Sequence, residues 1–136
     1  MDKVARSSIW NPLRRLGLLS IIVASVLVGA AVQARGPTGR LDTVALSALP
    51  VEAQKTQRLI HAGGPFPYSK DGVIFGNRER LLPRRQRGFY REYTVPTPGS
   101  RDRGARRIVC GGQRPKAPEA CYYTADHYAS FKLIAS

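Results

Sequence analysis

Short runs of β-branched and aromatic residues, separated by turn-forming residues, make up most of the chain after Gly63. The runs cover residues 73–75, 90–95, 107–110, 122–124 and 128–133. Extended backbone suits branched and aromatic side chains, whereas Gly, Pro, Asn and Asp favour turns, so runs of this kind predict strands. The pattern therefore limits the chain to a fold built on a small sheet of about five strands.

One helix is predicted before these strands, over residues 50–60. Pro50 suits a first helical turn, Glu52 suits the positive end of the helix dipole, and Gly63 or Gly64 suits the stop. The residues expected to face a core recur at spacings of three and four: Leu49, Ala53, Thr56 and Ile60. The sequence thus predicts an α+β domain in which an N-terminal helix packs on a small, about five-stranded antiparallel β-sheet.

The first 34 residues have the pattern of a secretory signal peptide. A basic leader ending at Arg15 precedes a charge-free apolar run over residues 16–32, and small residues lead up to Ala34. We expect cleavage after Ala34 and a secreted, extracellular product without stable membrane association. The alternative is an uncleaved membrane anchor, because the apolar run is close to the shortest that spans a bilayer. We interpret residues 35–45 as a mobile tail and residues 46–136 as the folded domain.

The chain is strongly basic, with a formal net charge of +13. A domain this basic attracts polyanions, which favours nucleic acid as a partner. The charge also has a simpler explanation, since it keeps a secreted protein soluble and includes Arg84, Arg85 and Arg87 in a predicted loop.

The two cysteines, Cys110 and Cys121, flank a stretch rich in Gly and Pro that must turn back on itself. Export would place both thiols in an oxidising compartment. We predict a disulfide between them across adjacent antiparallel strands, with Cα atoms roughly 5.5 Å apart. The alternative is a buried free Cys110 with an unpaired Cys121.

Four candidate catalytic residues lie in the C-terminal part of the chain: Glu92, Arg103, Arg107 and His127. Metal-free cleavage of an RNA phosphodiester needs this set of groups. A base accepts the proton of the ribose 2′-OH, an acid protonates the departing 5′-oxygen, and fixed cations hold the phosphate as its charge grows. Taken singly, the same residues are common on surfaces: a carboxylate in a strand is often solvated, and arginines on a loop need no special role.

The sequence around these residues resembles that of the secreted microbial guanyl-specific ribonucleases, the family that also contains barnase. Long stretches carry the resemblance, including GGPFPYSKDGVIFGNRE, REYTVPTPGSRDRGARRIVCG and YYTADHYASFKLI. The family fold is a helix packed on an antiparallel sheet, with the site on the other face of the sheet. Ala45 stands where many relatives have the first cysteine of an end-to-end disulfide, so that bridge is not expected here.

The resemblance implies roles for the candidate residues. It makes Glu92 the general base and His127 the general acid, with Arg103 and Arg107 as phosphate ligands that also favour the ionised form of Glu92. Asp126, next to His127, is expected to favour its protonated form. Tyr128 resembles a tyrosine at the phosphate site, although a tyrosine half in the core would have the same sequence pattern.

The resemblance also implies a guanine-binding segment, Phe75-Gly76-Asn77-Arg78-Glu79. Guanine presents two adjacent donors, N1–H and the N2 amino group, which one carboxylate can accept, and Glu79 matches the family's guanine-reading residue. Phe75 could stack on a base. Gly76 departs from the family, where a larger polar residue is usual. Pattern alone would make Asn77-Arg78-Glu79 an ordinary turn.

Together these features predict a monomeric, metal-independent endoribonuclease without cofactors. It would cleave single-stranded RNA after guanosine through a 2′,3′-cyclic phosphate. A barstar-like protein inhibitor is a candidate partner, because some relatives have one and a basic site suits an acidic inhibitor. The rival hypothesis is a catalytically weak cationic protein that uses the same scaffold to bind RNA or anionic surfaces.

Overall fold

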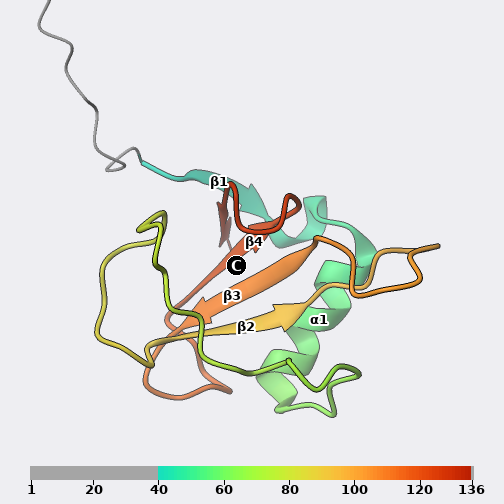
Figure 1. The fold of residues 1–136 in the computed structure, drawn as a ribbon, viewed down its shortest axis with the longest axis horizontal. Helices are drawn as coiled ribbons and strands as arrows, with labels where there is room; N and C mark the ends of the chain where they lie inside the picture. Colours follow the sequence, from blue (N-terminus) through green and yellow to red (C-terminus); the bar gives the residue numbers. More distant parts are fainter. Residues whose placement is uncertain (1–39, 136) are drawn as a thin grey trace, which may run out of the picture. The chain divides into compact units, whose positions relative to one another are not determined.

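The computed structural model describes residues 40–135, which form one α-helix and a five-stranded sheet (Figure 1). In chain order the elements are β1 (Asp42–Ala45), the short 3-10 helix η1 (Leu46–Ala48), α1 (Val51–Ala62), β2 (Tyr90–Thr94), β3 (Arg107–Gly111), β4 (Ala120–Thr124) and β5 (Lys132–Ala135). The predicted α+β architecture is confirmed. Across these residues no helix has the length and apolar character that crossing a membrane requires. The predicted leader lies outside the described residues.

The sheet has the strand order β1-β5-β4-β3-β2. Strands β2 to β5 pair antiparallel, but β1 pairs parallel with β5, from Asp42 opposite Lys132 to Ala45 opposite Ala135. The sheet is therefore mixed, not wholly antiparallel as expected. Residues 42–45 also differ from the expected tail, because Thr43 and Val44 are β-branched and find a partner strand at the far end of the chain.

Residues 73–75 run beside β2 but form only one isolated bridge, between Ile74 and Arg91. The Phe75 N–H donates to the Tyr90 carbonyl at 2.9 Å, and the Glu92 N–H donates to the Val73 carbonyl at 3.0 Å. Gly72 and Asn77 have positive φ, of 83° and 46°, so the backbone turns away on both sides of this predicted strand. The last predicted strand also begins later than expected, at Lys132.

Helix α1 begins after Pro50 and ends at Gly63, which takes the left-handed conformation (φ 80°) and donates its N–H to the carbonyls of Ile60 and Leu59. This is the glycine C-cap that the sequence indicates. The four predicted core positions, Leu49, Ala53, Thr56 and Ile60, are all buried. The predicted helix and the face it buries are confirmed.

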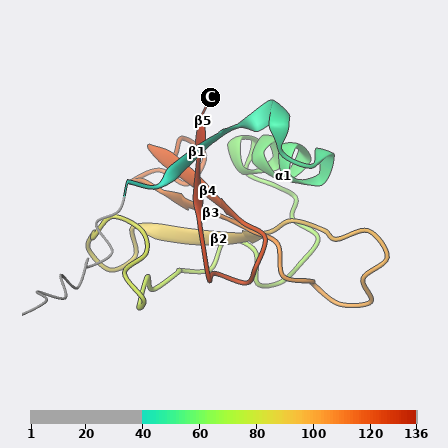
Figure 2. The ribbon, with the colours of Figure 1, turned by 90° about the horizontal axis from the view of Figure 1, so that it is seen from above.

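The sheet has two covered faces (Figure 2). Helix α1 packs on one of them, over a cluster that includes Tyr93, Ile108 and Tyr123. A second cluster occupies the opposite face and includes Tyr90, Val109 and Tyr122. Side chains alternate between faces along each strand, so Glu92 and Thr94 of β2 belong to the helix-free face with Tyr90.

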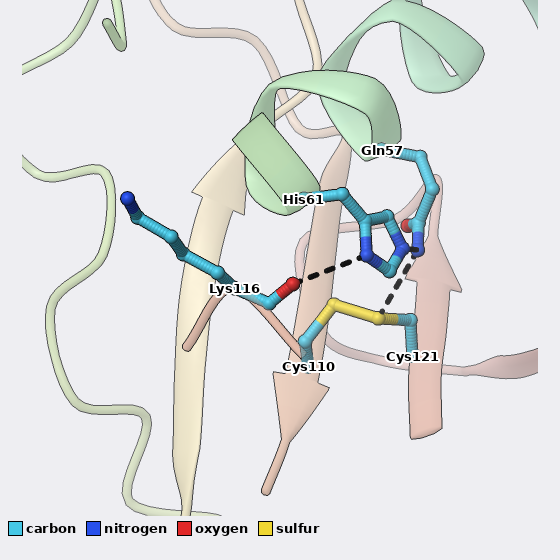
Figure 3. Close-up of a disulfide and its surroundings, with 5 residues drawn as sticks. All are labelled: Gln57, His61, Cys110, Lys116 and Cys121. Carbon is cyan, nitrogen blue, oxygen red and sulfur yellow. Dashed lines mark hydrogen bonds between the residues drawn. A yellow bond between two sulfur atoms is a disulfide. The ribbon is translucent and has the colours of Figure 1, made fainter. Parts of the chain in front are cut away.

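A disulfide joins Cys110 and Cys121 beneath α1 (Figure 3). The two residues are direct partners in the β3–β4 ladder, and both are buried. Their Cα atoms are 4.1 Å apart, closer to the spacing of a non-hydrogen-bonded antiparallel pair (about 4.5 Å) than to the value expected from the sequence. Gln57 of α1 donates from Nε2 to Cys121 Sγ at 3.4 Å. The predicted bridge is confirmed.

Candidate active site

A cleft of about 1050 Å³ opens on the helix-free side of the sheet. Two of the predicted catalytic residues, Glu92 and His127, line it. So does every residue of the predicted guanine-binding segment, together with Tyr128. Residues from three separate parts of the sequence therefore meet at this cleft, but Arg103 and Arg107 are not among the residues that line it.

Glu92 lies in the middle of β2, and its side chain is only 14% exposed. The hydroxyl of Tyr128 donates to Oε2 of Glu92 at 2.8 Å, and Nη2 of Arg103 lies 3.4 Å from Oε1. Each carboxylate oxygen thus has one donor, and one of the two donors carries a permanent positive charge. Both contacts hold the carboxylate in place at the cleft.

Thr94 holds Arg103 in place. It lies two residues after Glu92 in β2, so the two side chains are on the same face of the strand. Nε and Nη2 of Arg103 donate to the Thr94 hydroxyl oxygen at 3.0 and 2.8 Å. Thr94 is itself buried. Because two nitrogens of the guanidinium are held on one fixed acceptor, its plane is set, and Nη2 is directed toward Glu92.

Arg107, at the start of β3, is almost completely buried, with 3% of its surface exposed. Its Nη1 donates to three main-chain carbonyls, those of Arg103, Gly104 and Arg106, at 3.3, 2.9 and 2.7 Å. Its Nε is buried and has no hydrogen-bond partner among the described residues. Arg107 is therefore a positive charge that the main chain of Arg103, Gly104 and Arg106 holds in place, and its Nε is closed off from solvent.

Asp126 organises the loop that carries His127 and Tyr128. Its carboxylate accepts hydrogen bonds from the Ser130 hydroxyl at 2.6 Å, from the Ser130 N–H at 2.9 Å and from the Thr124 hydroxyl at 2.8 Å. These bonds, those from Ser130 foremost, lower the pKa of Asp126. Every hydrogen bond that the Asp126 carboxylate makes among the described residues is to Thr124 or Ser130, so its direct role there is to hold the loop.

His127 and Tyr128 both have positive φ, of 53° and 71°. The bend is held from two sides: the His127 N–H donates to the Ala105 carbonyl at 3.1 Å, and the Tyr128 N–H donates to the Thr124 hydroxyl oxygen at 3.1 Å. His127 remains exposed, with its ring 4.9 Å from that of Tyr128. The loop therefore presents an accessible imidazole beside the residue that binds Glu92.

Tyr128 is an uncharged donor throughout the neutral range. Burial, together with the hydrogen bond to Glu92 and the charge of Glu92, raises its pKa to about 12. Its ring stacks on Phe75, with centroids 5.1 Å apart, and the Arg107 guanidinium lies 6.0 Å from its centroid. Tyr128 is thus both half-buried and a site residue, which combines the two interpretations of the sequence.

The Asn77 side chain links the predicted guanine-binding segment to the main chain of Leu82, five residues later. Its Nδ2 donates to the Leu82 carbonyl at 2.9 Å, and its Oδ1 accepts the Leu82 N–H at 3.1 Å. The backbone of Asn77 is left-handed, which Asn tolerates better than most residues. Because its side chain is hydrogen-bonded to Leu82, Asn77 can contact a base only through its main chain.

The other members of this segment differ in exposure. Arg78 and Glu79 are exposed at the cleft, whereas Phe75 is half-buried and also packs edge-on against Phe131, with centroids 5.9 Å apart. Steric crowding does not require a glycine at position 76, since a Cβ there would lie 3.6 Å from its nearest neighbour, Arg78 Cγ. A larger residue would therefore fit in its place.

The sequence analysis did not identify several residues of the site. Thr94 is one, because a threonine in a strand has the pattern of an ordinary β-former. Arg85, Gln86 and Arg87 also line the cleft. The sequence shows the charge of Arg85 and Arg87, but nothing in a loop sequence places that charge beside the candidate catalytic residues. Within residues 40–135, no three His, Cys, Asp or Glu side chains gather as metal ligands would.

Comparisons with known proteins point in one direction. A family model described as ribonuclease matches residues 32–135. Guanyl-specific ribonuclease Sa of Kitasatospora aureofaciens is 59% identical over 92 residues, which cover 68% of this chain and 92% of that protein. Guanyl-specific ribonuclease St of Saccharopolyspora erythraea is 49% identical over 98 residues, covering 72% and 92%. A solved structure of ribonuclease Sa2 with guanosine-2′-cyclophosphate is similar with a TM-score of 0.64 and 47% identity, covering 71% of this chain and 97% of that one.

Proposed function

Because this chain belongs to the family of microbial guanyl-specific ribonucleases, we propose that it cleaves single-stranded RNA on the 3′ side of guanosine through a 2′,3′-cyclic phosphate. The cyclic ester is then hydrolysed to a 3′-phosphate. The similarity to guanyl-specific ribonuclease Sa and to ribonuclease Sa2 bound to guanosine-2′-cyclophosphate supports this substrate class. DNA lacks the attacking 2′-OH and is not a substrate.

The observation that carries the proposal is the environment of Glu92. A largely buried carboxylate receives one donor on each oxygen, from Tyr128 and from Arg103, and faces a cleft that an exposed His127 also lines. In the first step Glu92 accepts the proton of the 2′-OH, and the 2′-oxygen attacks phosphorus. His127 gives a proton to the departing 5′-oxygen. In the second step the roles reverse, and water replaces the leaving nucleoside.

Arg103 and Arg107 stabilise the phosphate as negative charge builds on its equatorial oxygens. Arg107 is suited to this because its Nη1 is held by three main-chain carbonyls and its guanidinium lies 6.0 Å from the ring centroid of Tyr128, a residue that lines the cleft. A guanidinium fixed in this way needs no reorganisation as the charge grows. Two permanent cations also provide the positive charge that a metal ion would otherwise supply, so we propose a metal-independent reaction.

Guanine selectivity rests on the segment from Phe75 to Glu79. The exposed carboxylate of Glu79 can accept both N1–H and the N2 amino group, and main-chain N–H groups held in place by the Asn77–Leu82 pair can meet O6 and N7. Adenine has an acceptor at N1, which a carboxylate disfavours. Phe75 is stacked on Tyr128, so a base would meet only its free edge or its other face.

The remaining parts of the proposal concern the whole protein. The basic leader and apolar run support export and cleavage after Ala34, with a monomeric domain released outside the cell. A basic cleft would suit an acidic inhibitor of the barstar kind.

The test is cleavage of GpU and ApU dinucleotides by the protein lacking residues 1–34, with and without EDTA. We expect rapid cleavage of GpU, slow cleavage of ApU and no effect of the chelator. Binding of RNA without cleavage of GpU would favour the rival hypothesis of a cationic binding protein. Strong inhibition by EDTA would show that the reaction depends on a metal.

A further inference from the structure

The segment Pro83-Arg84-Arg85-Gln86-Arg87, called here the arginine loop, lies between the guanine-binding segment and β2, and all five of its residues are exposed. Arg85, Gln86 and Arg87 line the same cleft as Glu79 and Glu92. We propose that Arg85 and Arg87 bind the phosphate on the 5′ side of the selected guanosine, so that RNA chains are better substrates than GpN dinucleotides. The inference rests on the proposed ribonuclease function.

The arginine loop is held in place at several points. The Tyr90 hydroxyl donates to the Pro83 carbonyl at 2.6 Å, and the Phe89 N–H donates to the Gln86 carbonyl at 3.2 Å. The Arg85 guanidinium lies over the Phe89 ring, 4.9 Å from its centroid. These contacts fix where the loop presents its charge, which lowers the entropy cost of binding an anion.

The charge of the arginine loop is not neutralised by a neighbour. Arg103–Glu92 is the one side-chain ion pair found within residues 40–135, so neither Arg85 nor Arg87 has a carboxylate partner there. Burial raises the pKa of Tyr90 to about 12 and also raises that of Tyr122, and the positive charge of Arg85 partly offsets both increases. Arg85 therefore lies close to the helix-free face on which the cleft opens.

The position along β2 indicates which phosphate the arginine loop meets. Arg103 is hydrogen-bonded to Thr94 and Glu92, whereas the arginine loop is hydrogen-bonded to Tyr90. Tyr90 lies two residues before Glu92, so the backbone positions of these two residues are about 7 Å apart along the strand. That distance is comparable to one nucleotide step of an extended strand. The scissile phosphate would occupy the Arg103 end, and the arginine loop would meet a neighbouring phosphate.

The link to the guanine-binding segment gives the direction. Asn77 is bonded to Leu82, the residue immediately before the arginine loop, so the loop borders the guanosine side of the cleft. The leaving nucleotide departs from the side of the general acid, His127, on the other loop. The phosphate that continues the chain on the guanosine side is its 5′-phosphate. Two forked guanidinium groups suit phosphate oxygens and stay charged at every accessible pH.

The experiment compares kcat/KM for GpU, pGpU and GpUp with the protein lacking residues 1–34. We expect pGpU to exceed GpU by about three- to tenfold at low salt, the range for exposed charge-assisted contacts. The double variant R85Q/R87Q should lose this advantage, with the ratio of pGpU to GpU falling to about one. The salt dependence of log kcat/KM for pGpU should also become shallower by about 0.7, the slope for one released phosphate contact in single strands.

The matched control is R58Q/R114Q, which removes the same charge from two exposed arginines outside the cleft lining. This variant should keep the wild-type ratio of pGpU to GpU. An equal loss of the ratio in both variants would mean that only overall charge matters and would overturn the subsite. A gain for GpUp that depends on Arg85 and Arg87 would overturn the assigned direction.

The outcomes separate the subsite from the function on which it rests. If wild-type protein cleaves GpU but pGpU is no better, the subsite is wrong and the proposed function stands. If GpU is not cleaved at all, the proposed function fails first. Circular dichroism and thermal melting of each variant establish that the comparison is made between folded proteins.

Discussion

Replacement of Thr94 by Val tests how the site holds Arg103, the arginine proposed to bind the phosphate. The change keeps the branched shape but removes the hydroxyl that accepts Nε and Nη2 of Arg103 at 3.0 and 2.8 Å. The main-chain bonds of Thr94, to Asp71 and from Thr56, are unaffected. Arg103 would keep only its longer contact with Glu92, at 3.4 Å.

The size of the effect follows from the exposure of Arg103. Hydrogen bonds to a charged group contribute about 1.5–3 kcal/mol when buried, but the Arg103 side chain is 29% exposed and water can replace part of the loss. We therefore expect a loss of about 1–2 kcal/mol of transition-state stabilisation, which is a decrease in kcat/KM of about 5- to 30-fold. Because Arg103 acts on charge that grows in the transition state, most of the decrease should be in kcat.

The assay is steady-state cleavage of GpU by T94V, with T56V as the matched control. Thr56 lies on α1, is equally buried, and donates to the Thr94 carbonyl at 3.2 Å on the helix side of the sheet. T56V should lower the free energy of unfolding by about 1 kcal/mol and leave kcat/KM within about twofold.

A double-mutant cycle separates positioning from direct damage. In an R103A background, T94V should cost less than about twofold, since the group that it positions is already gone. Loss of the same factor in both backgrounds would refute the idea that Thr94 acts through Arg103. Activity of T94V within about twofold of wild type would refute it as well.

Three further predictions concern other parts of the molecule. The variant E79Q should reduce the preference for GpU over ApU by about 5- to 150-fold, because a mismatched polar contact costs about 1–3 kcal/mol; an unchanged preference would exclude Glu79 as the guanine reader. The variant D126N should be less stable than wild type at neutral pH, and the difference should disappear as pH falls below about 4. The pKa of Asp126 is lower in the folded protein than in the unfolded chain. The ionised carboxylate therefore stabilises the fold above the ordinary carboxyl pKa, and this stabilisation is lost as pH falls through the lowered value. A stability difference between D126N and wild type that persists at lower pH would contradict this. Reduction of the Cys110–Cys121 bridge should lower the free energy of unfolding by about 2–3 kcal/mol, measured by urea titration with and without reductant, and two thiols that alkylate in unfolded, unreduced protein would show that the bridge does not form in solution.

Local patterns predicted the elements whose partners are near in sequence. Leu49, Ala53, Thr56 and Ile60 follow helical spacing, and Gly63 ends the helix, so α1 and its buried face could be predicted. Strands β3 and β4 are joined by a short turn, which brings Cys110 opposite Cys121. In each case the determining contacts are short-range.

The parallel pair of β1 and β5 could not be predicted in the same way. Asp42 pairs with Lys132, and no local signal links the two ends of the chain. The short run Thr43-Val44 follows a segment rich in Gly and Pro and resembles a tail when considered alone. Pairing between distant strands depends on the assembled sheet and not on the composition of either strand.

Some features of the candidate site could be predicted from the sequence, and others could not. The resemblance to the guanyl-specific ribonucleases identified Glu92, Arg103, Arg107 and His127, a set that fits the chemistry of RNA cleavage, and the structure places Glu92 and His127 at one cleft. The supporting contacts were not predictable, because the role of Thr94 depends on which loop lies over its face of β2. The bonds of Asp126 to Ser130 likewise depend on the left-handed bend at residues 127 and 128.

The most direct test of the proposed mechanism is the pH dependence of GpU cleavage by the wild-type protein and by E92A and H127A. We expect a bell-shaped profile of kcat/KM for the wild type and a loss of at least about a hundredfold in each variant, the usual effect of removing a general base or acid. Each variant should lose one limb of the bell. Near-wild-type activity of H127A, or a profile that keeps both limbs in E92A, would contradict the assignment of these residues as acid and base.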